Sequence, residues 1–166
     1  MKKAKKILKS FAPFADRRSK ILILGTMPGP VALKKREYYG FSGNHFWKII
    51  ARLFHVKKPL TYPEKIRLLK KNKIALWDVF KSCERSGAAD SAIARAELND
   101  IPGLLKRYPN IKTIFLNSRM AEKIFLEHFA ASVKIPFYYL PSTSPANAAV
   151  SFSKKFLAWK IISFWI

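Results

Sequence analysis

Four short apolar runs place the strongest limit on how this chain can fold. The runs cover residues 20–25, 73–78, 112–117 and 135–140, and a polar or Gly/Pro-containing turn follows each. Helical spacing of apolar residues lies between them, over 46–54, 63–71, 101–108, 118–129 and 152–164. Continuous apolar strands that alternate with helices are typical of a parallel sheet with both faces covered. The sequence therefore predicts an α/β fold with three layers, α/β/α, around a central four-stranded parallel sheet.

The chain length suits one domain, because 166 residues fall within the usual size of a single domain. Hydrophobic residues make up 49% of the chain and aromatic residues 14%, which is enough to form a core. We expect a single, monomeric domain over residues 1–166, in which residues 1–17 form a basic N-terminal extension.

The charge of the chain is strongly unbalanced. It carries 32 Lys and Arg against 10 Asp and Glu, a net charge of +22. Such an excess favours a polyanionic partner, because Lys and Arg gain affinity by releasing counterions from phosphates. Charge alone leaves nucleic acid, an acidic membrane surface and the ribosome open, and of these nucleic acid is favoured.

The chain is poor in metal ligands. A single cysteine, Cys83, excludes an intrachain disulfide, a thiolate zinc site and a four-cysteine iron–sulfur cluster. His45, His55 and His128 lie far apart in the sequence and lack the H-E-x-x-H spacing. We therefore expect neither a metal nor another cofactor.

Neither end of the chain has the pattern of a membrane segment. Pro13 and Asp16 interrupt the stretch in which a signal peptide would need an apolar region. The apolar run over residues 156–166 is shorter than the ~20 residues that span a bilayer. We expect a cytoplasmic protein that does not contact a membrane.

The residues that bind a ligand should follow the four runs, because open α/β sheets bind ligands beyond the carboxyl ends of their strands. The first run ends in Gly25-Thr-Met-Pro-Gly-Pro30, a rigid turn whose backbone can approach a ligand closely. It has neither the P-loop nor the G-x-G-x-x-G pattern. Taken alone, it can equally be an ordinary turn.

Three further segments offer polar groups at the same edge, each with a plainer alternative. Asn44 can contact a ligand or cap the helix that follows it. Asn117 can present its amide to the edge of a base or end a strand. The loop 140–148 is rich in hydroxyl groups that can hold phosphates, or it is a surface turn.

Together these segments resemble the uracil-DNA glycosylase superfamily, and most of all its hypoxanthine-DNA glycosylase branch. The motifs are Gly25-Thr-Met-Pro-Gly29, Tyr38-Tyr39, Asn44-His-Phe-Trp47, Trp77-Asp78 with Cys83-x-Arg85-x-Gly87, and Pro141-Ser-Thr-Ser-Pro-Ala-Asn147. Their order covers most of the chain, from about Ile21 to Trp159. Met27 stands where the mismatch-specific enzymes carry a water-positioning Asn, and no match to the Asp general base of classical uracil-DNA glycosylases is visible.

The resemblance implies an enzyme that excises deaminated bases from DNA in base-excision repair, with hypoxanthine, uracil and xanthine all left open. In this reading Asn44 is the catalytic residue and orients a water. The implied base-binding residues are Gly25, Thr26, Met27, Tyr39 as the stacking face and Asn117 as the reading edge. The implied DNA-binding residues are Ser142, Thr143, Ser144, Pro145 and Asn147. No lysine is clearly placed to attack the sugar, so the resemblance implies a monofunctional glycosylase.

Two other functions stay open at this point. One is a non-catalytic nucleic-acid-binding protein on the same fold, and the other is an α/β enzyme that acts on a small nucleotide or phosphoester. Cleavage of lesion duplexes would separate the glycosylase from the first alternative, and failure to bind DNA would favour the second.

Overall fold

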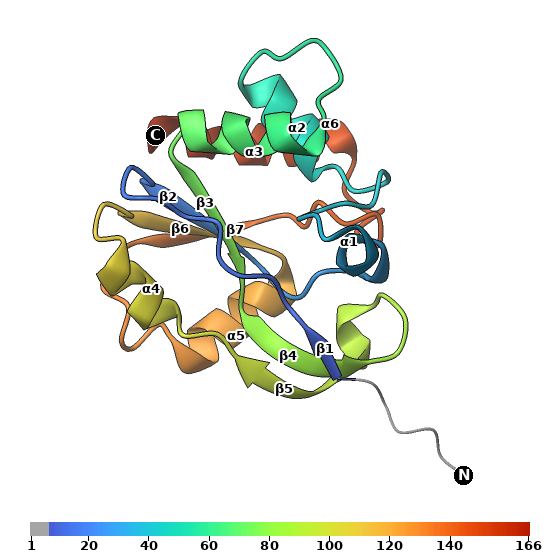
Figure 1. The fold of residues 1–166 in the computed structure, drawn as a ribbon, viewed down its shortest axis with the longest axis vertical. Helices are drawn as coiled ribbons and strands as arrows, with labels where there is room; N and C mark the ends of the chain where they lie inside the picture. Colours follow the sequence, from blue (N-terminus) through green and yellow to red (C-terminus); the bar gives the residue numbers. More distant parts are fainter. Residues whose placement is uncertain (1–6) are drawn as a thin grey trace.

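A four-stranded parallel sheet forms the centre of the molecule in the computed structural model, which describes residues 7–166. The strand order is β3-β2-β6-β7, and all neighbours are parallel. The strands are β2 (Ile21–Gly25), β3 (Ile74–Asp78), β6 (Thr113–Asn117) and β7 (Phe137–Leu140). They coincide with the four apolar runs, which confirms the predicted sheet (Figure 1).

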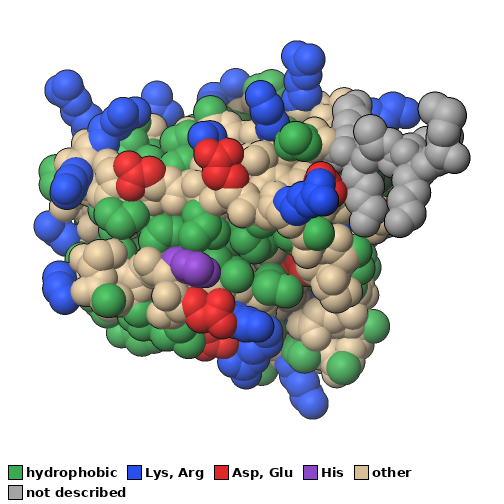
Figure 2. Space-filling model, turned by 90° about the horizontal axis from the view of Figure 1, so that it is seen from below, with side chains coloured by type: hydrophobic (Ala, Val, Ile, Leu, Met, Phe, Trp, Pro, Cys, Tyr) green, Lys and Arg blue, Asp and Glu red, His purple; other side chains and the backbone are tan. Residues whose placement is uncertain are grey.

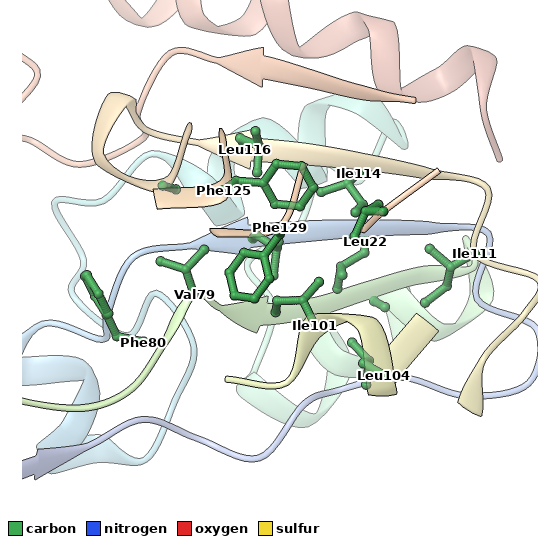
Figure 3. Close-up of a cluster of buried hydrophobic side chains, with 14 of the residues drawn as sticks. Leu22, Val79, Phe80, Ile101, Leu104, Ile111, Ile114, Leu116, Phe125 and Phe129 are labelled. Carbon is green, nitrogen blue, oxygen red and sulfur yellow. The ribbon is translucent and has the colours of Figure 1, made fainter. Parts of the chain in front are cut away.

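Helices cover both faces of this sheet, because its central strands present apolar side chains in both directions. Ile21 and Ile23 of β2 contact one hydrophobic cluster, and Leu22 and Leu24 contact the other. The first cluster includes residues of α2 (Phe46–Leu53), α3 (Tyr62–Lys71), α6 (Phe152–Trp159) and the 3-10 turn η2 (Lys160–Phe164). The second lies against α4 (Ile101–Arg107) and α5 (Arg119–His128), as Figure 3 shows. The predicted three layers are therefore confirmed.

A second, antiparallel sheet was not predicted. It has the order β1-β4-β5, with β1 (Ile7–Lys9), β4 (Phe80–Arg85) and β5 (Ile93–Leu98), the last following the 3-10 turn η1 (Asp90–Ala92). Only Val79 separates β3 from β4, so the chain passes directly from one sheet into the other. The sequence pattern does not reveal these strands, because β4 buries few side chains and β5 buries none fully.

Part of the expected N-terminal extension belongs to the folded body. β1 pairs with β4, and the Phe14 N–H donates to the Leu76 carbonyl at 2.9 Å. Residues 7–17 are thus joined to both sheets, whereas residues 1–6 of that extension lie outside the described residues. In the part of the chain that the structure describes, no helix is both long enough and apolar enough to cross a membrane.

Candidate active site

The carboxyl ends of the four parallel strands meet at one edge of the sheet. Gly25 of β2 pairs in register with Asp78 of β3, and Asn117 of β6 pairs with Leu140 of β7. The short helix α1 (Pro30–Lys35) and the loop after β7 lie beyond the same edge (Figure 1). The topology therefore brings together three of the predicted segments at the edge where α/β sheets bind ligands.

Asn117 is the centre of a hydrogen-bond network at this edge. Its Nδ2 donates to Tyr39 Oη at 3.2 Å and to Thr143 Oγ1 at 3.1 Å. Its Oδ1 accepts from the Thr143 backbone N–H at 3.0 Å. Asn117 is 5% exposed and Thr143 is fully buried. Both amide protons are therefore used inside the protein, and only one lone pair of Oδ1 remains for a ligand.

Tyr39 is held in place from several sides. Its ring stacks on Phe46 of α2 with the centroids 3.8 Å apart and an angle of 17° between the planes. Its backbone φ is 53°, in the left-handed region that residues other than glycine rarely adopt. Burial raises the pKa of its hydroxyl far above the usual range, so the group stays a neutral O–H. One face of the ring is covered by Phe46.

Asp78 and the Tyr39 hydroxyl both lie beside Gly25. A Cβ atom added to Gly25 would be 2.6 Å from Asp78 Oδ1 and 3.2 Å from Tyr39 Oη, so only glycine fits there. Asp78 is 4% exposed, and Ser10 Oγ donates to its Oδ2 at 2.7 Å. The pKa of the carboxyl is raised to about 7, chiefly by burial, with a smaller contribution from Asp90, while Ser10 and Arg85 lower it. This acid therefore holds its proton close to neutral pH.

Arg85 and Asp90, from the β4–β5 hairpin, add charge behind the Gly25–Pro30 turn. Arg85 Nη2 donates to the Pro28 carbonyl. Its Nε and Nη1 are buried and make no hydrogen bond within the described chain. Burial raises the pKa of Asp90, whereas a hydrogen bond with the Thr26 hydroxyl and the charge of Arg85 lower it. A cation and two acids, all half-buried or more deeply buried, thus lie together at this edge.

Asn44 lies two residues before the first residue of α2. Its Oδ1 accepts from the Phe46 backbone N–H at 2.9 Å, as a helix-capping amide does. The next residue, His45, donates its backbone N–H to the Thr143 carbonyl at 2.9 Å. Asn44 therefore lies beside the loop that binds Asn117, and its Nδ2 makes no hydrogen bond in the described chain.

The loop after β7 divides into a buried part and an exposed part. Thr143 is fully buried against Asn117, whereas Pro145 and Ala146 are exposed and Ser142, Ser144 and Asn147 are half-buried. Asn147 Nδ2 donates to the Ser142 carbonyl at 3.2 Å, which closes the turn. Lys155 of α6, itself 1% exposed, donates to the Ser144 carbonyl at 3.2 Å.

Comparison with known proteins decides which family has this arrangement. The family model described as the uracil DNA glycosylase superfamily matches residues 12–165. The chain belongs to this superfamily. The resemblance seen in the motifs is therefore confirmed, and with it the prediction of an enzyme of the DNA glycosylase type.

Individual relatives of this superfamily member agree. A protein of Methanosarcina acetivorans named hypoxanthine DNA glycosylase is 36% identical over 148 residues, which cover 87% of this chain and 91% of the relative. A protein of the same name from Methanosarcina barkeri is 38% identical over 110 residues, covering 66% and 70%. A solution NMR structure of a candidate uracil DNA glycosylase from M. acetivorans superposes with a TM-score of 0.79 at 32% identity, covering 95% of this chain and 99% of that one.

Three of the residues expected to contact the base or the DNA in this glycosylase have side chains that are buried in the protein. Met27 is 7% exposed and packs in the hydrophobic cluster beside α4 and α5. Thr26 is 6% exposed, and its Oγ1 lies 2.9 Å from Ser118 Oγ. Thr143 is fully buried. For Met27 and Thr26 the backbone is the part that can face a base, and Thr143 holds Asn117 rather than a phosphate.

Asp78 is the residue that the sequence does not single out as a site residue of this glycosylase. In the sequence it is visible only as part of the Trp77-Asp78 motif. Nothing in the apolar run that it ends shows that its carboxyl group is buried. The available signal is its position: an ionisable residue ends β3 at the edge where ligands bind.

Proposed function

We propose that this glycosylase hydrolyses the N-glycosidic bond of deoxyinosine in DNA, releasing hypoxanthine and leaving an abasic site with the strand intact. The observation that carries the proposal is the buried carboxyl of Asp78 beside Gly25, at the edge that Tyr39 also lines. Two relatives that match most or two thirds of the chain are named hypoxanthine DNA glycosylase, which supports the choice of base.

The protonated carboxyl of Asp78 suits a leaving purine that carries a carbonyl oxygen. When the glycosidic bond breaks, negative charge develops on the base, and a neutral O–H donor stabilises it. A carboxylate at the same position would repel it. The pKa of about 7 keeps a large share of Asp78 in the donor form at neutral pH. Uracil and xanthine also carry carbonyl oxygens, so both belong in the substrate test.

Tyr39 supplies the stacking face for a flipped base. Phe46 covers one face of its ring, and the other face is the one proposed to receive the base. In this role Asn117 acts mainly on Tyr39 and Thr143, whose positions its amide fixes, and reads the base only through its remaining lone pair.

Asn44 is proposed to orient the attacking water. An amide is not basic near neutral pH, so its contribution is to position the water rather than to take its proton. Its Oδ1 already accepts from the Phe46 N–H at the start of α2, which fixes the side chain, and its Nδ2 is the group left for the water. The half-buried and exposed part of the loop, Ser142, Ser144, Pro145 and Asn147, is proposed to contact the DNA backbone.

Two finer points belong to the same proposal. The protein acts as a monomer, which the single α/β body with two helix-covered faces supports. It works in the cytoplasm, which its likeness to the two Methanosarcina glycosylases supports. Sedimentation with and without a lesion duplex tests the first point, and fractionation of cells tests the second.

Single-turnover cleavage of matched oligonucleotides tests the proposal. Duplexes with one deoxyinosine, deoxyuridine or deoxyxanthosine are incubated with excess protein and then treated with alkali to cut abasic sites. We expect cleavage of the deoxyinosine strand only after alkali. The Asp78→Asn variant should keep activity, since its amide also donates, whereas Asp78→Leu should lose it while still binding DNA. No base release from any lesion by a folded protein would reject the proposal.

A further inference from the structure

A cluster of cations lies at the amino ends of the parallel strands, opposite the candidate active site. An open cavity of about 530 Å³ is lined there by Arg17, Arg18, Lys20, Lys73, Asn110, Lys112 and Trp165. Lys20, Lys73 and Lys112 stand just before β2, β3 and β6, so they mark the amino ends of three neighbouring strands. In Figure 2, Lys and Arg side chains lie around the outline of this face, and several of them lie at its left end, the side on which β2 and β6 begin in Figure 1.

The sheet holds these cations close together. The Lys20 N–H donates to the Lys73 carbonyl at 2.8 Å, and the Lys112 N–H donates to the Lys20 carbonyl at 2.8 Å. Neighbouring strands in a sheet are about 4.8 Å apart, so the three lysines leave the backbone at close intervals. Asn110 Nδ2 donates to the Arg17 carbonyl at 2.7 Å and ties the arginine loop to the same edge. The backbone therefore fixes the starting points of these cationic side chains near one another.

Within residues 7–166, few acidic side chains form ion pairs with this cluster. Among residues 7–166, the ion pair of Arg18 with Asp16, at 3.4 Å, is the one that involves a cation of the cavity. Arg17, Arg18, Lys20 and Lys112 are exposed, and Lys73 is half-buried. Like charges gathered in this way repel one another, and an anion bound among them relieves that repulsion.

This cavity and the candidate active site lie at opposite ends of the strands of the parallel sheet. β2 has five residues, which makes it about 17 Å long, and the cavity lies at its beginning while Gly25 lies at its end. A lesion duplex bound at the carboxyl edge has its phosphates at that edge. The cations at the amino edge are therefore free for a different anionic segment.

We propose that this cavity binds a second segment of nucleic acid as a single strand, with its phosphates on the cations and one base against Trp165. The five cations come from three chain segments, residues 17–20, Lys73 and Lys112, and they line an open cavity, which suits an extended chain of phosphates better than one small anion. Trp165 is half-buried and packs beside Tyr138, with the ring centroids 5.8 Å apart, so an aromatic face adjoins the charges. Combined cations and aromatic rings are the usual means of binding single strands without sequence preference.

The test measures binding of a labelled single strand to protein already saturated with a lesion duplex. A fluorescein-labelled 12-nucleotide strand is titrated by anisotropy at several salt concentrations. Triple substitution of Arg17, Lys20 and Lys112 by Gln should weaken this second binding at least tenfold and leave duplex affinity unchanged. The plot of log K against log salt should become shallower by about 0.7 for each phosphate that the variant no longer neutralises. Trp165→Leu should weaken the strand's binding by about fivefold or more, since it removes a stacking face.

A matched control removes the same charge elsewhere. Arg67, Lys106 and Lys134 are exposed and form no ion pair in the described chain, so replacing all three by Gln lowers the net charge equally. Equal losses in the two triple variants would overturn the proposal, as would the absence of any second binding. Displacement of the strand by tripolyphosphate at concentrations that leave a duplex bound would assign the cavity to a small polyanion and also overturn it. Base release plays no part in this test, so its result is independent of the proposed substrate.

Discussion

Substitution of Asp78 by Asn should stabilise the protein at neutral and higher pH, and the gain should vanish in acid. The folded state holds the proton of Asp78 to about pH 7, against a pKa of 3.8 for an ordinary Asp. Between these values the folded state binds more protons than the unfolded chain, so its stability falls as the pH rises. Asparagine cannot ionise, so the stability of the variant does not fall in this pH range for this reason.

The magnitude follows from the difference between the two pKa values. A difference of about three units, at about 1.4 kcal/mol for each, gives roughly 4 kcal/mol. The stability from the neutral carboxyl is fully present below about pH 4, declines from there and is lost once the pH passes through about 7. The difference in the free energy of unfolding between variant and wild type should therefore grow by about 4 kcal/mol from pH 4 to pH 8.

Urea unfolding at half-unit steps of pH measures this difference. Glu127→Gln is the control, because Glu127 is an exposed carboxylate whose side chain is 49% accessible. It removes the same negative charge from the surface. Its contacts with Lys123 and His128, at 3.9 Å each, are exposed and weak, so its difference from wild type should change far less with pH than that of Asp78→Asn. An Asp78→Asn difference that is also constant from pH 4 to pH 8 would refute the reasoning that burial holds this carboxyl neutral.

Three further results are expected. Asn44→Ala should lower the rate of single-turnover base release by about 100-fold or more. It should also destabilise the protein by about 1 kcal/mol, because the bond to the Phe46 N–H is lost. Asn44→Ser keeps an oxygen for that bond, so it should melt like wild type yet release the base slowly, and normal base release by Asn44→Ser would show that Asn44 is not catalytic. Affinity for a lesion duplex should fall linearly on a log–log plot against salt, with a slope of about −0.9 per neutralised phosphate, whereas a flat titration would mean that the +22 charge serves another partner. Chelators should leave activity intact, because no three His, Cys, Asp or Glu side chains group as metal ligands within residues 7–166; stoichiometric zinc or iron in the active protein would contradict this.

The sequence predicted the parallel sheet correctly because burial on both faces leaves an unmistakable pattern. Ile21 to Leu24 are all fully buried, and so are their neighbours in β6. The antiparallel sheet left no such pattern. In β4 only Phe80 and Cys83 are buried, and β5 is half-buried at its ends and exposed between them. Strands of this kind form because partner strands far away in the sequence supply their hydrogen bonds.

The sequence predicted the positions of the candidate site residues in the fold more accurately than their contacts. The turn at Gly25 and the amide of Asn117 lie at the predicted edge of the sheet. The sequence could not show that Asn117 and Thr143 use their polar groups on each other, because these bonds join residues 26 positions apart. Nor could it show that Ser10 reaches Asp78 across 68 positions. Such pairings depend on the folded arrangement and leave no periodic trace in the sequence.

The bond between Ser10 and Asp78 bears on how this protein should be prepared. Residues 1–17 are basic and precede the first strand of the main sheet, so a cloning boundary placed near Ile21 looks harmless. Such a boundary would delete β1, the Phe14 pairing with Leu76, and the hydroxyl that donates to the buried carboxyl beside Gly25. A shortened protein that expresses well but has altered activity would then reflect damage to the site itself rather than the loss of a dispensable tail.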